Sequence, residues 1–137
     1  MGRESAVPKK TGVLLVNLGS PDAPTSSAVR RYLKQFLWDP RVVNLPRFLW
    51  WMILHFLVLP FRPRKSAKAY KKIWQDKGSP LSFLTQELTE KVAEQFKDQR
   101  YSIDCVMRYG KPAIAKQLAR YKKDQIDELI VIPLYPQ

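Results

Sequence analysis

The chain has 137 residues, of which 45% are apolar and 26% charged, and this composition is typical of one folded domain. It carries 24 Lys and Arg against 12 Asp and Glu. The net charge of +12 favours an anionic partner, such as nucleic acid, anionic lipid, or a ligand with carboxylates or phosphates. The single cysteine, Cys105, excludes an intrachain disulfide and fits a reducing cytosol.

The first elements are a tail, a strand and a helix. Residues 1–11 lack the apolar core of a signal peptide, and we interpret them as a flexible tail before an α/β domain over 12–137. The apolar run at 13–18, closed by Gly, Ser and Pro, is typical of a strand buried on both faces. A Thr-Ser-Ser run at 25–27 offers N-caps for a helix over 28–38. One face of this helix carries its apolar residues at spacings of three and four: Val29, Tyr32, Leu33, Phe36 and Leu37.

The next segment, 48–61, is apolar at every position except His55. It is too short to span a bilayer, which takes about 20 residues. Basic residues flank it on both sides. It is therefore either a core helix or a lip helix that lies partly in a membrane interface or at the mouth of a ligand site.

The second part of the chain predicts two strands and three helices. A short basic helix is expected at 66–74 and a longer one at 80–97. The run at 101–107 alternates partly and is predicted to be a strand with Cys105 as a buried small residue, and the run at 128–135 is predicted to be a buried strand. A proline opens a helix over 112–123. Three residues of that helix are expected to face inward: Ile114, Leu118 and Tyr121.

Apolar strands separated by helices indicate an α/β fold with a parallel sheet covered on both faces. A ligand of such a sheet binds beyond the carboxyl ends of its strands. Arg108, Tyr109 and Tyr135 follow the second and third strands. Arg108 suits an anion, and the tyrosines offer flat apolar faces with a hydroxyl. The alternative is that Gly and Pro only shape turns there and that Arg108 is solvated.

Several familiar sites have no support in the sequence. There is no glycine-rich nucleotide motif and no His and Cys cluster for zinc. Nothing indicates that Cys105 and His55 form a catalytic pair. Aromatic and basic residues interleave at 62–74 and 120–123, but a solvated helix surface explains this pattern better than nucleic-acid binding does.

Five segments in one order resemble a known family. They read LLVNLGSP, VRRYLKQFLWDPRVV, FRPRKSAKAYKKIWQDKGSPLSFLTQ, MRYGKP and PLYPQ. Together they are similar to the amino-terminal half of bacterial ferrochelatase, from about Thr11 to Gln137. The resemblance implies a Rossmann-like three-layer chelatase half with a parallel sheet, truncated before the second domain.

The same resemblance implies a function and a set of site residues. Ferrochelatases insert Fe2+ into protoporphyrin IX in heme biosynthesis, with the porphyrin held in a cleft between two similar halves. Seven residues match family positions in or near that cleft: Leu18, Arg62, Tyr70, Ser79, Arg108, Tyr109 and Tyr135. Leu18 stands where some relatives have Tyr or Met, so no metal ligand is expected there. The segment 48–61 matches the lip of the cleft, which faces the bilayer in membrane-associated relatives. Ser79 could otherwise be only an N-cap.

The resemblance also implies that the catalytic groups lie in a second half. The family uses a His and a Glu of that half, as proton acceptor and Fe2+ ligands, whereas His55 matches no catalytic position and is interpreted as structural or interfacial. We therefore expect no catalytic residue and no metal ligand here, no organic cofactor, no metal insertion by this chain alone, and at most weak porphyrin binding. The chain ends inside the loop after Tyr135, which reads as a truncation that exposes apolar surface and favours association. The resemblance leaves open whether the intact enzyme holds an iron–sulfur cluster.

Two other functions remain open. One is a short chelatase that forms its cleft by homodimerising, although no histidine beyond His55 is available for it. The other is a porphyrin- or heme-binding module without activity. The expected partners are protoporphyrin IX, a membrane surface at 48–61, and a separate second half or second copy, but not nucleic acid. The expected location is the cytoplasm, with peripheral membrane association.

Overall fold

The computed structural model describes residues 7–136, and these divide into two compact units. Unit 1 consists of residues 7–18, 85–108 and 112–136, and unit 2 of residues 19–84 and 109–111. Part of the predicted tail, residues 1–6, lies outside the described residues.

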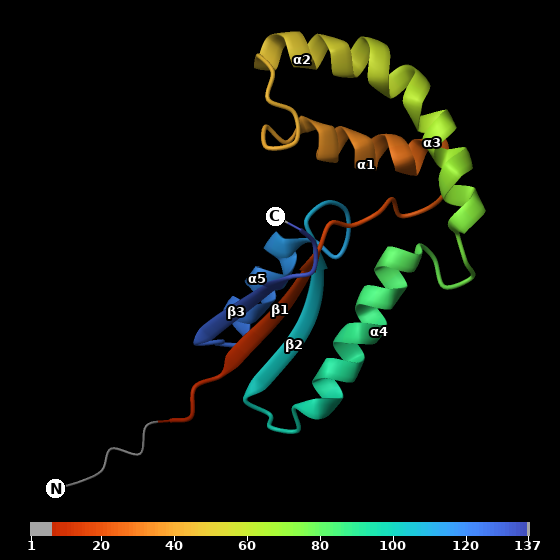
Figure 1. Ribbon diagram of the computed structural model, residues 1–137. Coiled ribbons are helices and arrows are strands. Elements are labelled where there is room, and N and C mark those ends of the chain that lie inside the picture. The colour runs from red at the N-terminus through yellow and green to blue at the C-terminus, as the bar shows by residue number, and fades with distance from the viewer. Residues whose placement is uncertain (1–6, 137) are drawn as a thin grey trace, which may run out of the picture. The chain divides into compact units, whose positions relative to one another are not determined.

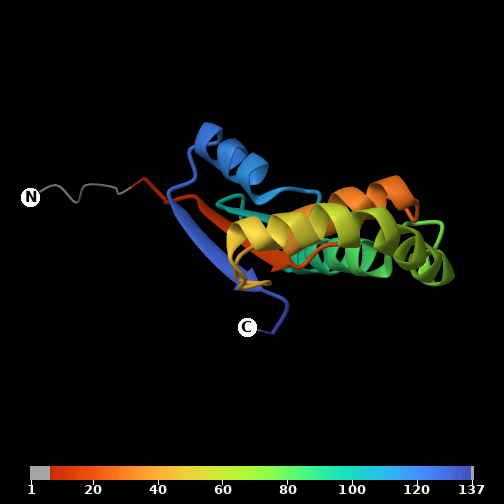
Figure 2. The ribbon, with the colours of Figure 1, turned by 90° about the horizontal axis from the view of Figure 1, so that it is seen from above.

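Unit 1 is built on a parallel sheet of three strands in the order β2-β1-β3. These strands are β1 (Thr11–Asn17), β2 (Tyr101–Met107) and β3 (Glu128–Pro133). Figures 1 and 2 show α5 (Ile114–Lys123) on one face of the sheet and α4 (Pro80–Gln95), which belongs to unit 1 from Thr85 onward, on the other. The predicted α/β class and parallel sheet are confirmed.

The core of unit 1 lies between the sheet and α5. Leu14 and Val16 of β1 and Val106 of β2 pack there with Tyr121 of α5. The Tyr121 hydroxyl donates a hydrogen bond to Asp104 Oδ2 at 2.7 Å, so its one buried polar atom is satisfied. The Tyr121 ring also packs against Gly12 of β1, where an added Cβ would lie 2.6 Å from Cε2 of the ring, so this position has no room for a side chain.

The strands differ in burial. Six of the seven residues of β1 are buried, as predicted for a strand covered on both faces. The prediction of burial was wrong for β3, whose residues are all exposed because it pairs only with β1 and forms one edge of the sheet. Leu118 of α5, predicted to face inward, is also exposed, whereas Tyr121 is buried and Ile114 half-buried.

Unit 2 is helical. Its helix α1 (Ser26–Trp38) starts at the N-cap Thr25, whose hydroxyl accepts a hydrogen bond from the Ala28 N–H. The second part runs without interruption through α2 (Arg47–Ile53), the π-helix η1 (Leu54–Val58) and α3 (Leu59–Ile73), as Figure 1 shows. The prediction of two separate helices at 48–61 and 66–74 was therefore wrong.

Two prolines explain that difference. Pro60 and Pro63 look like helix breakers in the sequence. Pro60 falls at the start of α3, directly after the wider turn of η1, whereas Pro63 lies inside α3 and does not end the helix. The two helical layers of unit 2 enclose a core whose buried members are Val29, Leu33, Leu37, Trp50, Leu54, Leu59 and Ala67.

Candidate functional site

A groove follows one side of η1 and α3 and contains the predicted site residue Arg62. It has a volume of about 650 Å³. Its wall residues recur at spacings of three and four, so the helix places them on one side: Leu57, Val58, Phe61, Arg62, Lys65, Ser66 and Ala69. An apolar floor with two cations at its edge suits a flat apolar molecule that carries carboxylates.

Tyr70 lies two turns beyond Arg62 on α3. It is half-buried against the core of unit 2, and its ring meets Trp74 edge to face with 6.4 Å between centroids. Burial raises the pKa of Tyr70 above its ordinary value. A phenol is neutral at pH 7 even at the ordinary pKa of 10.0, so the Tyr70 hydroxyl can donate a hydrogen bond.

Ser79 stands at the start of α4 and is only 4% exposed. Its carbonyl oxygen accepts hydrogen bonds from the N–H groups of Ser82 and Phe83, at 3.0 and 3.1 Å. These bonds begin the helix, so Ser79 has a structural role as an N-cap residue. Its predicted contact with a porphyrin propionate stays a prediction.

Tyr109 is buried in unit 2 and joins the loop 109–111 to α1. Its hydroxyl donates a hydrogen bond to Asp39 Oδ2 at 2.8 Å, and its ring meets Phe36 edge to face at 5.1 Å. The next residue, Gly110, donates its N–H to Gln35 Oε1. These contacts hold the loop in place and leave little of Tyr109 exposed for a ligand.

The other predicted residues belong to unit 1. Arg108 and Tyr135 line one hollow of about 350 Å³, together with apolar residues of the sheet and α5. The Arg108 N–H donates to the Asn17 carbonyl at 2.8 Å, which ties the end of β2 to the end of β1. Leu18 follows β1, is partly exposed, and donates its N–H to Asn17 Oδ1. The structure thus brings Arg108 and Tyr135 together, as the positions of the strand ends predicted.

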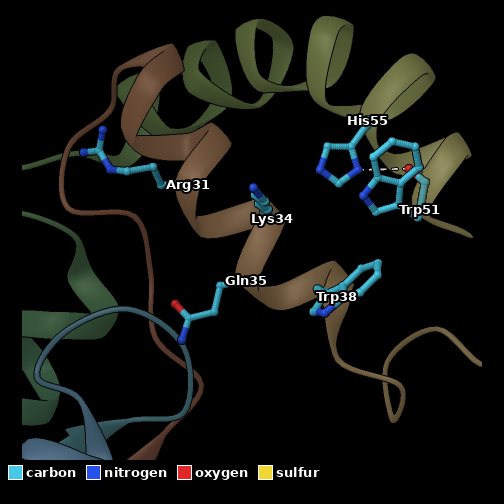
Figure 3. Close-up of a pocket in the computed structure, with 6 residues that line it drawn as sticks. All are labelled: Arg31, Lys34, Gln35, Trp38, Trp51 and His55. Atoms are coloured by element: carbon cyan, nitrogen blue, oxygen red, sulfur yellow. Dashed lines mark hydrogen bonds between the residues drawn. The ribbon is translucent and has the colours of Figure 1, made fainter. Parts of the chain in front are cut away.

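A further hollow contains no residue of the predicted site. It has a volume of about 490 Å³ and is lined by residues of α1, α2 and η1 (Figure 3): Arg31, Lys34, Gln35, Trp38, Trp51 and His55. A signal for it exists in the sequence, because Arg31, Lys34 and Trp38 share one side of α1 and Trp51 and His55 share one side of the next helix.

Residues 7–136 contain neither a cluster of metal-ligating side chains nor a membrane-spanning helix. Nowhere in that range do three or more His, Cys, Asp or Glu side chains gather in a way that could hold a metal ion. Within the same range, every helix is too short or too polar to cross a membrane.

The sequence is similar to a well-defined family. The family model described as Ferrochelatase matches residues 10–137. Two relatives named ferrochelatase, from Marinobacter nauticus and Alcanivorax borkumensis, are each 49% identical to this chain over 134 residues. The matched region covers 95% of this chain, but only 36% of the Marinobacter protein and 39% of the Alcanivorax protein. A relative named ferrochelatase 2, from Shewanella oneidensis, is 51% identical over 130 residues, or 93% of this chain and 40% of its own. The chain thus spans well under half the length of these relatives. Because the family model covers nearly all of its residues, the chain belongs to the ferrochelatase family.

Proposed function

We propose that this chain forms one wall of the cleft that holds protoporphyrin IX while Fe2+ is inserted, a step of heme biosynthesis. The observation that carries the proposal is the groove with Arg62 and Lys65 on η1 and α3, in a chain of the ferrochelatase family. Protoporphyrin is a flat apolar disc with two carboxylates on one edge. Leu57, Val58 and Phe61 suit the disc, and the two cations suit the carboxylates.

Two more predicted residues of unit 2, Tyr70 and Ser79, add to this wall in the proposal. The Tyr70 hydroxyl donates a hydrogen bond to a propionate. Ser79 is a second donor. Leu18, Arg108, Tyr109 and Tyr135 stay predicted porphyrin contacts, because they match cleft positions of the family.

Metal insertion needs a base that accepts the two pyrrole protons and ligands that carry Fe2+. An imidazole and a carboxylate suit both tasks. The groove with Arg62 has neither group. We therefore assign these groups to the part of the family's length that this chain does not span, and we expect the 137-residue chain alone to lack metal-inserting activity. Zinc insertion into a porphyrin, followed by fluorescence, measures this directly.

That assay also separates the alternatives. Fast insertion that persists in His55→Ala would favour a short homodimeric chelatase and contradict our assignment of the base. A cleft wall and an inactive binding module would both bind porphyrin saturably without inserting metal. They differ when the remaining segment of the family's length is added as a second polypeptide, because only a cleft wall would then gain metal insertion.

The proposed wall is tested by titrating metal-free protoporphyrin IX into the purified chain and following its fluorescence. Arg62→Ala is expected to weaken binding about tenfold, because a hydrogen bond to a charged group is lost. Arg64→Ala is the matched control, since Arg64 is an exposed arginine on the same helix and does not line the groove. Equal affinities for the two variants would overturn the proposal.

A membrane surface is a second proposed partner, and it rests on one observation. Phe48, Phe56 and Phe61 are 75%, 63% and 71% exposed on a segment flanked by basic residues. Apolar side chains next to cations are typical of helices that lie in the surface of an anionic bilayer. Phe56→Ser with Phe61→Ser is expected to reduce sedimentation with phosphatidylserine vesicles, whereas Leu84→Ser, an exposed apolar residue on α4, is expected not to.

A further inference from the structure

We propose that the hollow between α1 and the α2–η1 segment binds an iron porphyrin, with His55 as an axial ligand of the iron. The inference deepens the proposed function and rests on it in one respect, because an iron porphyrin is the product of that reaction. The hollow shares no residue with the groove of Arg62 and Lys65.

The first argument is the state of the His55 ring. Nδ1 lies 2.9 Å from the carbonyl oxygen of Trp51 (Figure 3). A carbonyl oxygen can only accept, so Nδ1 carries the proton and donates it. In the neutral ring Nε2 then keeps its lone pair. An imidazole held this way, with Nδ1–H on a backbone carbonyl and Nε2 available, is the usual state of a metal-ligating histidine.

The second argument is the aromatic lining. Trp51 stacks on the His55 ring with 4.8 Å between centroids and 30° between planes. Trp38 enters from α1, and the Arg47 guanidinium covers one face of its ring at 3.7 Å while donating a hydrogen bond to the Trp38 carbonyl. These contacts fix both indoles. Because Trp51 lies only 30° from the imidazole plane, it would meet a macrocycle bound at Nε2 edge to face, and Trp38 adds a second aromatic ring to the lining.

The third argument is charge. Arg31 and Lys34 line the hollow from α1, and in Figure 3 His55 lies between Lys34 and Trp51. Both cations are exposed, so they can pair with propionates without any cost of burying a charge. Gln35, the remaining polar residue, is engaged with the Gly110 N–H and does not compete for the ligand.

The fourth argument is local structure and size. His55 belongs to the π-helix η1, and wide turns of this kind often occur at functional sites. The volume of about 490 Å³ lies within the range of about 300 to 1,000 Å³ for small-molecule sites. In the proposed complex Nε2 donates its lone pair to iron and replaces a water ligand, and no electron is transferred.

The test compares hemin with metal-free protoporphyrin IX on the intact 137-residue chain. Hemin should bind the wild type with a shifted Soret band. His55→Ala should lose that shift, bind hemin at least about tenfold more weakly, and bind metal-free protoporphyrin as the wild type does. Free imidazole should restore the shift in His55→Ala, since it supplies the missing ligand. Lys34→Ala should weaken hemin binding and keep the Soret position.

The outcomes separate this inference from the proposed function. A folded His55→Ala that keeps the wild-type Soret shift and hemin affinity overturns the inference. If His55→Ala loses its far-UV circular dichroism, His55→Gln is measured with the same expectations. Arg62→Ala is expected to weaken only metal-free protoporphyrin binding. If it leaves that affinity unchanged while His55→Ala still abolishes the hemin shift, then the cleft proposal fails and the iron-porphyrin site stands.

Discussion

Strand β1 and the helical segment 47–61 are both long apolar stretches, but the fold treats them differently. In β1 the sheet and its helices cover both faces, and six of seven residues are buried. In 47–61 burial recurs only at Trp50, Leu54 and Leu59, and the residues between them are largely exposed. Folding of the described residues therefore accounts for the apolar character of β1 but for only one side of the helical segment. The exposed side is where we expect partners to bind.

The largest difference in stability is expected between truncations of a buried and an exposed leucine of η1. Leu54 is fully buried and Leu57 is 62% exposed, and both are leucines of the same five-residue element. Leu54→Ala should lower the free energy of unfolding by about 2 to 5 kcal/mol. Leu57→Ala should change it by less than about 0.5 kcal/mol. Urea denaturation measures both. Similar losses would mean that the exposed side is also packed.

The next test addresses β1. A Cβ added at Gly12 would lie 2.6 Å from Cε2 of Tyr121, a ring held by its bond to Asp104. Gly12→Ala should therefore cost about 1 to 3 kcal/mol through overpacking. Because the clash is with one side chain, adding Tyr121→Leu to Gly12→Ala should make the two losses less than additive. Additive losses would show that the crowding has another source.

A smaller effect on stability is expected from the ionisation of Tyr32, a half-buried residue of α1. Burial raises the pKa of Tyr32 to about 12, and its hydroxyl donates to the Gly19 carbonyl at 3.0 Å. The unfolded chain loses this proton near its ordinary value of 10.0, before the folded chain does. This contribution to stability is thus complete below pH 10 and declines as pH rises toward 12.

The measurement is the urea midpoint at pH 9 and pH 11. The wild type should lose more stability over this interval than Tyr32→Phe, which has no proton to release. An equal loss in both proteins would show that Tyr32 ionises in the folded state as readily as in the unfolded one.

Local patterns predicted much of the fold. The strand at 101–107, the helix capped by Thr25, and the parallel order of strands all follow from periodicity and capping signals. Exposure of β3 did not follow, because a strand's apolar sequence does not show whether it will be central or at an edge of the sheet. On α4, Thr85 and Thr89 are buried and Leu84 and Leu88 exposed. Asn17 Nδ2 donates a hydrogen bond to the Thr85 hydroxyl, and the Thr89 hydroxyl donates one to the Thr85 carbonyl. The apolar pattern of the helix does not reveal these contacts.

The candidate site was predictable to a similar degree. Strand order placed Arg108 near Tyr135, and the resemblance to the family indicated Arg62. The hollow at His55 was not predicted, because it forms only where α1 packs against the α2–η1 segment. Core residues such as Leu33 and Leu54 set this packing, and the residues that line the hollow do not.

In our proposal the exposed side of 47–61 and the adjoining turns of α3 receive the porphyrin. Hydrogen exchange of the purified chain, followed by mass spectrometry with and without metal-free protoporphyrin IX, measures this along the whole chain. We expect slower exchange in peptides covering residues 54–70 and unchanged exchange in β1, which is already buried. Slower exchange confined to unit 1, with 54–70 unaffected, would contradict it.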